Sequence, residues 1–214
     1  LYEEYLRVID EEKDLFCGVS DAIWDHPETC FEEYFAAELL TDVLEKNGFC
    51  VTRGLCGIPT AFKASFGDGT PRLGILAEYD ALDGFSQAGE CAEEHPLPDV
   101  DKAHGCGHNL FAGGSLAAAF AMKEYIQKTG KGSITLFGCP AEEGGGGKVF
   151  LARDGAFASI DAIVSWHPEK MYMVRTRPAL ANVMVDYAFT GVASHAGAAP
   201  HLGRSALDAV ELMN

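Results

Sequence analysis

The sequence predicts an α/β fold in which a mixed, largely parallel sheet carries helices on both faces. The start of a smaller α+β unit is expected to follow it. The strand-like runs 72–80, 133–140 and 160–168 alternate along the chain with segments of helical periodicity, which is typical of a sheet covered by helices. The run SITLFGC at 133–139 is apolar almost throughout, as expected for a strand buried on both faces.

The helical segments are recognised by the spacing of their apolar residues and by their end signals. Apolar residues recur at helical spacing over residues 2–23, and the proline of Asp25-His26-Pro27 ends that run. A second apolar stripe over 35–44 is closed by Asn47-Gly48, a typical C-terminal cap. The first fifty residues therefore predict two helices. The alanine-rich segment 110–130 predicts a third.

Two further segments have a less regular pattern. Short β-rich runs between residues 49 and 80 predict strands, with a hairpin turn at Gly67-Asp68-Gly69. Residues 83–103 are polar and interrupted by glycine and proline, which predicts a long loop. Loops of that length in compact domains are commonly functional.

A composition change near residues 175–178 predicts a domain boundary. We assign 1–177 to the N-terminal part of a catalytic domain and 178–214 to the beginning of a second domain. Within the latter, the alternating pattern of 181–194 predicts a strand and 205–214 predicts the start of a helix.

Composition excludes several classes of function. The chain has 16 basic and 32 acidic residues and a formal charge of −16, which argues against a nucleic-acid partner. It contains no apolar run of about 18 residues that would predict a membrane span. Seven scattered cysteines without a CxxC pair favour reduced thiols and a cytoplasmic location. The acidic N-terminus does not resemble a signal peptide, and because it lacks methionine we expect the chain to be trimmed there.

Chemically capable side chains follow three predicted strands. Glu78 and Asp80 end the first, the pair Glu142-Glu143 follows the second, and His167 follows the third. In open α/β sheets functional groups gather beyond the carboxyl ends of the strands. The motif HGCGHN at 104–109 opens a predicted helix that could face the same crevice. These residues are therefore expected to converge.

The converging groups suit a divalent metal ion. A thiolate (Cys106) and an imidazole (His108) favour zinc, and the carboxylates extend the range of metals toward manganese. One of Glu142 and Glu143 could be a ligand and the other a general base that takes the proton of an attacking water. Each group alone has an ordinary explanation: a small buried thiol, a glutamate pair at a helix N-terminus, a loop histidine. Their combination at strand ends favours a metal-dependent hydrolase.

Five motifs follow one another along the chain: EYDAL (78–82), HGCGHN (104–109), GCPAEEGGGGK (138–148), WHP (166–168) and GVASHAGAAPHLGRSALDA (191–209). In this order they resemble the dinuclear metallopeptidase family of aminoacylases and glutamate carboxypeptidases. Within it, the likeness is to the amidohydrolase subgroup, in which a cysteine takes the place of a metal ligand. The likeness extends over nearly the whole chain.

The resemblance implies a role for each motif residue. The ligands of two divalent metal ions, zinc or manganese, would be Cys106, His108, Glu143 and His167, with the thiolate between the two ions. Glu142 would be the general base, and Asp80 would orient a ligand. The small domain would be an inserted lid and dimerisation domain, in a homodimer or in a heterodimer with a paralogous subunit. Its residue His195 would polarise the scissile carbonyl in the neighbouring subunit, and His201 and Arg204 would contact a substrate carboxylate.

The implied reaction is hydrolysis of the amide bond of N-acyl or N-aroyl amino acids, with p-aminobenzoyl-glutamate as the first substrate candidate. The alternatives are a dipeptidase of the same family and a non-catalytic, metal-holding partner subunit. The chain departs from the subgroup at Asn109, where aspartate is common. The family also takes a ligand histidine from a region beyond Asn214, so we expect this chain to be part of a protein about twice as long and to be inactive alone.

Overall fold

The computed structural model describes residues 2–84, 86–176, 178 and 180–214. The chain forms two compact units, Leu1–Lys170 and Met171–Asn214. Residue 177, the last residue of the predicted catalytic domain, lies outside the described residues.

The first unit contains five α-helices among its described residues: α1 (Glu3–Glu11), α2 (Lys13–Asp25), α3 (Tyr34–Lys46), α4 (His108–Thr129) and α5 (Gly147–Arg153). The prediction of two helices before residue 50 was wrong, because the backbone at Glu12 leaves the helical region (φ −104°, ψ 19°) and separates α1 from α2. The separate α1 packs its Tyr5 ring edge-on against Tyr125 of α4. An apolar stripe alone does not reveal such a break, because partly buried Val8 and Ile9 of α1 pack against the same core as Phe16 of α2.

The strands of the first unit are β1 (Cys50–Arg53), β2 (Phe62–Phe66), β3 (Arg72–Ala77), β4 (Leu82–Asp83), β5 (Lys102–Ala103), β6 (Ser133–Gly138) and β7 (Ala162–Val164). A short 3-10 helix, η1 (Leu55–Gly57), joins β1 to β2. Five strands form a sheet in the order β1-β2-β6-β3-β7. The pairs β3–β6 and β3–β7 are parallel, and the pairs β1–β2 and β2–β6 are antiparallel. The predicted mixed α/β sheet is confirmed.

The predicted hairpin at Gly67-Asp68-Gly69 was wrong. These residues join β2 to β3, but β6 lies between the two strands and pairs with both. All six residues of β6 are buried. A strand that is apolar on both sides is stabilised most in the middle of a sheet, so β6 takes that position and separates two strands that are neighbours in sequence.

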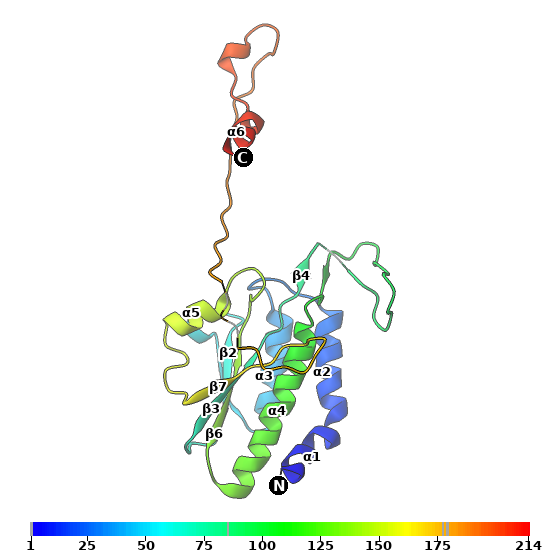
Figure 1. Ribbon diagram of the computed structural model, residues 1–214, viewed down its shortest axis with the longest axis vertical. Coiled ribbons are helices and arrows are strands. Elements are labelled where there is room, and N and C mark those ends of the chain that lie inside the picture. Colours follow the sequence, from blue (N-terminus) through cyan, green and yellow to red (C-terminus); the bar gives the residue numbers. More distant parts are fainter. Residues whose placement is uncertain (1, 85, 177, 179) are drawn as a thin grey trace. The chain divides into compact units, whose positions relative to one another are not determined.

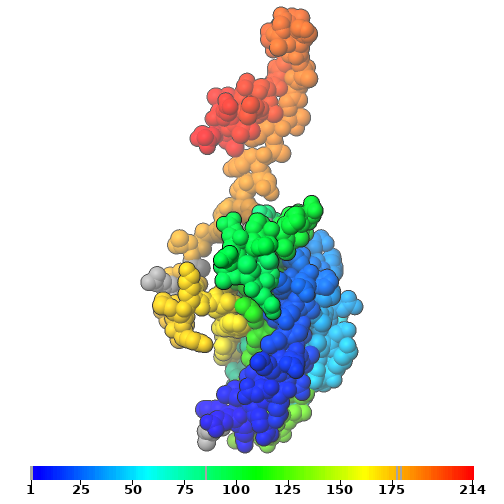
Figure 2. Space-filling view, turned by 90° about the vertical axis from the view of Figure 1, so that its right-hand side faces the viewer, coloured from blue at the N-terminus to red at the C-terminus, as the bar shows by residue number. Residues whose placement is uncertain are grey.

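The two faces of β6 pack into different cores, as expected for a sheet with helices on both sides. Ile134 and Leu136 belong to the large core that also contains residues of α2, α3 and α4. Phe137 belongs to a smaller core with Leu151 of α5. Figure 1 shows α4 running along the sheet beside α1 and α2. The helices α1 and α2, in blue, form much of the face shown in Figure 2.

The segment predicted as a loop over 83–103 has paired ends. β4 and β5 form a two-stranded antiparallel ribbon that closes its base. Within the segment, the Gln87 side chain donates to the Glu93 carbonyl (2.8 Å) and accepts from the His95 N–H (3.0 Å). The ribbon places the chain that leaves β3 next to the chain that enters α4. Two motifs separated by more than twenty residues are thereby brought together.

The second unit contains η2 (Pro200–Leu202) and α6 (Ala206–Met213) among its described residues. The predicted helix is confirmed, and the Ser205 hydroxyl caps it by accepting from the Asp208 N–H. The predicted strand over 181–194 was wrong: those residues form a single bridge, between Val192 and Arg204. A strand needs a ladder of partners, and the described residues of this unit supply one partner position.

Within the described residues, no helix combines the length and apolar character needed to cross a membrane.

We expect Leu116→Ala to lower the free energy of unfolding by about 2–5 kcal/mol, because Leu116 is fully buried in the large core and its truncation leaves a cavity. The matched control in the same helix is Leu110→Ala, where the side chain is 53% exposed and the change should stay within about 0.5 kcal/mol. Urea unfolding of both variants measures the difference. Equal destabilisation would contradict the assigned core.

Candidate metal centre

The parallel strands end together at one edge of the sheet. Ala77, the last residue of β3, is paired in register with Gly138, the last residue of β6. The residues that follow these strands, 78–80 and 139–143, therefore leave the sheet side by side. β7 runs parallel to β3 and leads to His167, while α4 begins at His108. The expected convergence of these sequence-remote residues is observed in the first unit.

Cys106 and His167 are in direct contact. The Cys106 Sγ lies 3.4 Å from the His167 Nε2. The other ring nitrogen, Nδ1, donates to the Pro168 carbonyl (2.8 Å). That bond assigns the proton to Nδ1, so the Nε2 lone pair faces the sulfur. The ligand atoms of Cys106, His108 and His167 all lie within 4.8 Å of one another.

His108 is fully buried and held on one side by Asp80. Its Nδ1 lies 2.8 Å from Asp80 Oδ1 and 3.1 Å from the Asp80 carbonyl, and since both partners are acceptors, Nδ1 carries the proton. Its Nε2 faces Glu78 Oε2 (3.1 Å) and Glu143 Oε1 (3.9 Å). Both Nε2 and Glu143 Oε1 are buried without a hydrogen-bond partner among the described residues. Carboxylate oxygens and a nitrogen lone pair repel one another unless a proton or a cation lies between them, so this arrangement fits a divalent cation.

Asp80 connects two of the converging segments. Its Oδ1 accepts from His108, and its Oδ2 accepts from the Glu143 N–H (2.9 Å). Burial would raise the pKa of Asp80, but these two hydrogen bonds, together with the charge interaction with His108, hold the pKa below its ordinary value. Asp80 therefore remains an anion that fixes the imidazole of His108 and the backbone of Glu143.

Glu142 and Glu143 both approach His108. Residues 142–145 form a turn and not a continuation of β6, so adjacent side chains need not point to opposite sides. Carboxylate oxygens of Glu78 and Glu142 lie within 4.8 Å of each other and of a His108 ring nitrogen. Glu142 is exposed overall, and the partial loss of solvent around its carboxyl raises its pKa, to which the charge of Glu78 adds. The side chains therefore form two overlapping sets of candidate metal ligands, and His108 belongs to both.

Glu78 was expected at this sheet edge from the sequence, but no role was predicted for it. It is buried and forms an ion pair with Lys148 at the start of α5. Among the described residues, Lys148 is the basic side chain that an ion pair brings into this group of carboxylates. The position of Lys148 near these carboxylates could have been predicted from the sequence, since it directly follows the glycine run after Glu142-Glu143.

The Cys106 thiol is protonated in this environment. Burial raises its pKa to about 12, and the neighbouring Glu143 carboxylate adds to the rise. Metal ions bind the thiolate, so loading this site would displace a proton from sulfur.

His167 is positioned by its neighbour Trp166. The Trp166 ring packs edge-on against Phe111 in the first turn of α4, and its Nε1 donates to Ser115 Oγ (3.2 Å). A Cβ at Gly114 would overlap the indole, so a glycine is needed at this contact. The glycine pair inside a predicted helix was the available signal for a close approach.

His104 has a structural role in the same motif. Its ring is buried and its Nε2 lies 3.1 Å from the Ile23 carbonyl at the end of α2. Burial lowers its pKa to about 4, so the ring is neutral and Nε2 donates. Asn109, the departure from the subgroup pattern, is also buried and donates to Ser20 Oγ (3.1 Å). Both side chains tie the motif to α2.

Three predicted site residues, His195, His201 and Arg204, lie in the second unit. His195 Nδ1 accepts from the N–H groups of Gly197 (3.1 Å) and Ala198 (3.0 Å). The ring proton therefore sits on Nε2, and the side chain is a hydrogen-bond donor at its exposed end. His201 lies in η2, and Arg204 donates from Nη1 to the Gly203 carbonyl.

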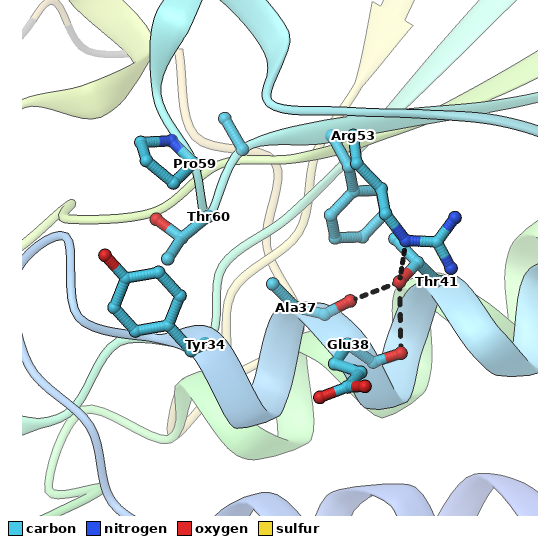
Figure 3. A pocket seen from close by; sticks show the side chains of 9 residues that line it. Tyr34, Ala37, Glu38, Thr41, Arg53, Pro59 and Thr60 are labelled. Carbon is cyan, nitrogen blue, oxygen red and sulfur yellow. Dashed lines mark hydrogen bonds between the residues drawn. The ribbon is translucent and has the colours of Figure 1, made fainter.

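A cavity of about 250 Å³ lies elsewhere in the first unit, between α3 and the start of β2. Figure 3 shows Tyr34, Glu38 and Thr60 around it, with Arg53 donating to the Thr41 hydroxyl (3.1 Å). None of the predicted site residues lines this cavity. The chemistry is concentrated at the sheet edge.

Comparison with known proteins agrees with this geometry. Residues 74–205 match the sequence profile of peptidase family M20/M25/M40. The chain is 46% identical over 216 aligned residues to a subunit of the p-aminobenzoyl-glutamate hydrolase of Escherichia coli, covering 99% of this chain and 45% of that protein. It is 33% identical to the human Xaa-Arg dipeptidase, covering 95% of this chain and 47% of that protein.

The fold is also found among solved structures. The YXEP protein of Bacillus subtilis, a dinuclear metal-binding peptidase of the M20 family, superposes with a TM-score of 0.62 at 22% identity, covering 79% of this chain and 44% of that one. The chain thus spans about half the length of the relatives it matches. With one family profile matching more than half of its residues and a relative at 46% identity over nearly all of them, the chain belongs to peptidase family M20/M25/M40.

Proposed function

We propose that this chain supplies most of the metal centre of a metal-dependent amidohydrolase that cleaves the amide bond of N-acyl or N-aroyl amino acids. One observation carries the proposal. The buried His108 presents Nε2 to Glu78 and Glu143, beside the Cys106–His167 pair, in a group of candidate ligands that fits a divalent cation. The relatives in the family act on amide or peptide bonds, as their names state.

The proposed ligands are Cys106, His108, Glu143 and His167, for two divalent ions that are zinc or manganese. When bound, the metal ions would supply Lewis-acid polarisation of the scissile carbonyl and of the attacking water. Asp80 orients His108 and fixes the Glu143 backbone, so it controls the geometry of two ligands.

Glu142 is the proposed general base. Its carboxylate takes a proton from the attacking water and returns it to the leaving amine. Both steps are favoured by a pKa above the ordinary carboxyl value, which the partial loss of solvent and the charge of Glu78 provide. His195, with its proton on Nε2, donates to the developing oxyanion in the site of the neighbouring subunit.

The substrate proposal is p-aminobenzoyl-glutamate, supported by 46% identity to a protein named for that substrate. His201 and Arg204 would bind a substrate carboxylate. Similarity to the Xaa-Arg dipeptidase keeps a dipeptide substrate as the second candidate. A relative named as a subunit supports a dimer, formed with a second copy or with a paralogue. Seven free thiols support a cytoplasmic location.

We expect Asp80→Ala in the full-length protein to weaken zinc affinity by about 10–100-fold, because His108 and Glu143 lose their shared orienting partner. Calorimetric titration with zinc measures the change. Asp83→Ala is the matched control, since Asp83 is exposed on β4 and should leave the affinity unaltered. Unchanged affinity in Asp80→Ala would refute the orienting role.

Turnover of the metal-loaded, full-length protein tests the function itself. We expect release of p-aminobenzoate from p-aminobenzoyl-glutamate, and Glu142→Gln should lower kcat by about 10²–10⁴-fold while zinc still binds, because the variant loses a proton acceptor and no ligand. Glu143→Gln is the comparison and should lose metal.

The reverse result, with metal lost in Glu142→Gln and retained in Glu143→Gln, would exchange the two assignments. Turnover of dipeptides alone would favour the dipeptidase. No turnover of any amide by well-loaded protein would favour the non-catalytic partner subunit.

We expect His195 to act across a subunit boundary. Full-length His195→Ala should bind zinc normally and turn over slowly, since it lacks the Nε2–H donor. Mixed with Glu142→Gln protein, it should recover up to about a quarter of wild-type activity, because half of the dimers are hybrids and each hybrid has one intact site of two. Hybrids isolated by two affinity tags that remain inactive would disprove the arrangement.

A further inference from the structure

The loop at residues 27–33, between α2 and α3, is bonded to the exits of both central parallel strands. The Glu28 carbonyl accepts from the N–H of Ala81 (2.7 Å), directly after Asp80. The Glu28 carboxylate accepts from the Phe35 and Ala36 N–H groups (2.9 and 3.1 Å) and so caps α3. Glu28 thus ties the loop both to the start of α3 and to the chain that follows Asp80.

Glu33 makes the second link. Its side chain is fully buried, and one oxygen, Oε1, accepts from two backbone N–H groups: Phe31 (3.0 Å) and Ala141 (2.8 Å). Phe31 (φ 63°) and Ala141 (φ 56°) are both in the left-handed region, which residues with a Cβ rarely adopt. One carboxylate oxygen therefore accepts hydrogen bonds from two residues whose backbone conformations are unfavourable.

Ala141 controls the direction of the chain at the centre. It follows Pro140 after β6 and directly precedes Glu142 and Glu143. Its carbonyl accepts from the N–H groups of Gly145 (3.1 Å) and Gly147 (3.3 Å), so its peptide geometry also sets the turn that follows. If Ala141 relaxed to an ordinary conformation, both glutamates would leave their present positions around His108.

The glycine run at 144–147 packs the turn against the same loop. A Cβ at Gly145 would overlap the Phe31 ring and lie 2.9 Å from Cys30 Sγ. A Cβ at Gly147 would overlap the Pro140 carbonyl. The run therefore allows close contact between the turn and the loop, and it explains a glycine-rich motif that has no phosphate-binding signature.

The chemistry of Glu33 argues against a simple filling role. Burial raises the pKa of its carboxyl, and no ion pair links it to a basic side chain among the described residues. Burying a carboxyl group lowers the stability of the fold unless the group is hydrogen-bonded. Here it provides the acceptor for the N–H groups of two residues in the left-handed region.

We propose that Glu33 is a positioning residue for the glutamate pair: by holding Ala141 in its left-handed conformation, it aims Glu142 and Glu143 at the metal centre. This inference deepens the proposed function and rests on it for its kinetic readout. Its structural readout, the protection of the Ala141 amide, is independent of any activity.

The test uses four variants of the full-length protein. Glu33→Met keeps the size of the side chain but removes the acceptor. Glu33→Gln keeps an acceptor oxygen. Glu32→Gln alters the exposed neighbour as a matched control. Glu33→Met combined with Ala141→Gly supplies a residue that adopts positive φ without help.

We expect Glu33→Met to lower kcat by about 10²-fold with little change in KM, because the Glu142 carboxylate is displaced slightly from the position needed for proton transfer. Cobalt affinity should fall, because Glu143 is displaced as well. At saturating cobalt the cobalt–thiolate absorption should persist, since Cys106, His108 and His167 come from other segments. Hydrogen exchange at the Ala141 amide should become fast. Glu33→Gln and Glu32→Gln should stay close to the wild type, and the double variant should recover at least about tenfold in kcat over Glu33→Met.

Three results would overturn the proposal: a Glu33→Met protein with wild-type kcat and a protected Ala141 amide, loss of the cobalt–thiolate band in step with kcat at saturating cobalt, or no recovery in the double variant. If Glu33→Met does not fold, Glu33→Ala with Ala141→Gly replaces it, and the same recovery over Glu33→Ala is required. If the wild type hydrolyses no amide substrate, the proposed function fails. Hydrogen exchange at the backbone N–H of Ala141 still decides whether Glu33 holds Ala141 in place.

Discussion

The bridge made by the Asp80 carboxylate is the interaction on which the rest of the centre depends. It joins the exit of β3 to the first residue of α4, His108, and to the backbone of Glu143 after β6. Three segments that are distant in sequence thus share one buried anion. Because both oxygens of Asp80 are satisfied, the anion is stable there, and its two partners have little freedom to move. The other candidate ligands are arranged around a histidine that Asp80 has already fixed.

The centre concentrates negative charge. Glu78, Asp80, Glu142 and Glu143 surround His108, and the ion pair of Lys148 with Glu78 offsets part of that charge. Glu78 and Asp80 are buried and Glu143 is partly buried, and placing such carboxylates together is unfavourable unless cations compensate them. Binding of divalent ions would therefore stabilise the folded state, since the unfolded chain does not present these groups together. In this physical sense the metal-binding proposal follows from the packing, apart from any relative.

Sequence reasoning succeeded where local patterns decide the structure. The apolar run of β6 predicted a buried strand, and the arrangement of the strand ends then predicted that Cys106, His108, Glu143 and His167 lie close together, as they do. It failed where distant contacts decide. The strand-like run 181–194 has one bridge partner, and β6 displaced the hairpin expected at 67–69. Glu33 was missed for the same reason, since it acts on Ala141, a residue 108 positions away.

The groups assembled at this centre are almost all acceptors. His108 Nε2 faces the Glu78 carboxylate, and His167 Nε2 presents its lone pair to the Cys106 sulfur. The carboxylates of Glu78, Glu142 and Glu143 accept, and Lys148 is engaged with Glu78. Such a set can bind cations and remove protons, but a negatively charged oxygen that forms during amide cleavage needs hydrogen-bond donors as well. Within the proposed mechanism, His195 meets that requirement. Its Nδ1 is occupied by two backbone N–H groups, so its exposed Nε2 can serve as a donor and not as a further base. The first unit thus has the composition expected of a metal and base site, and the proposed mechanism assigns the missing hydrogen-bond donor to His195.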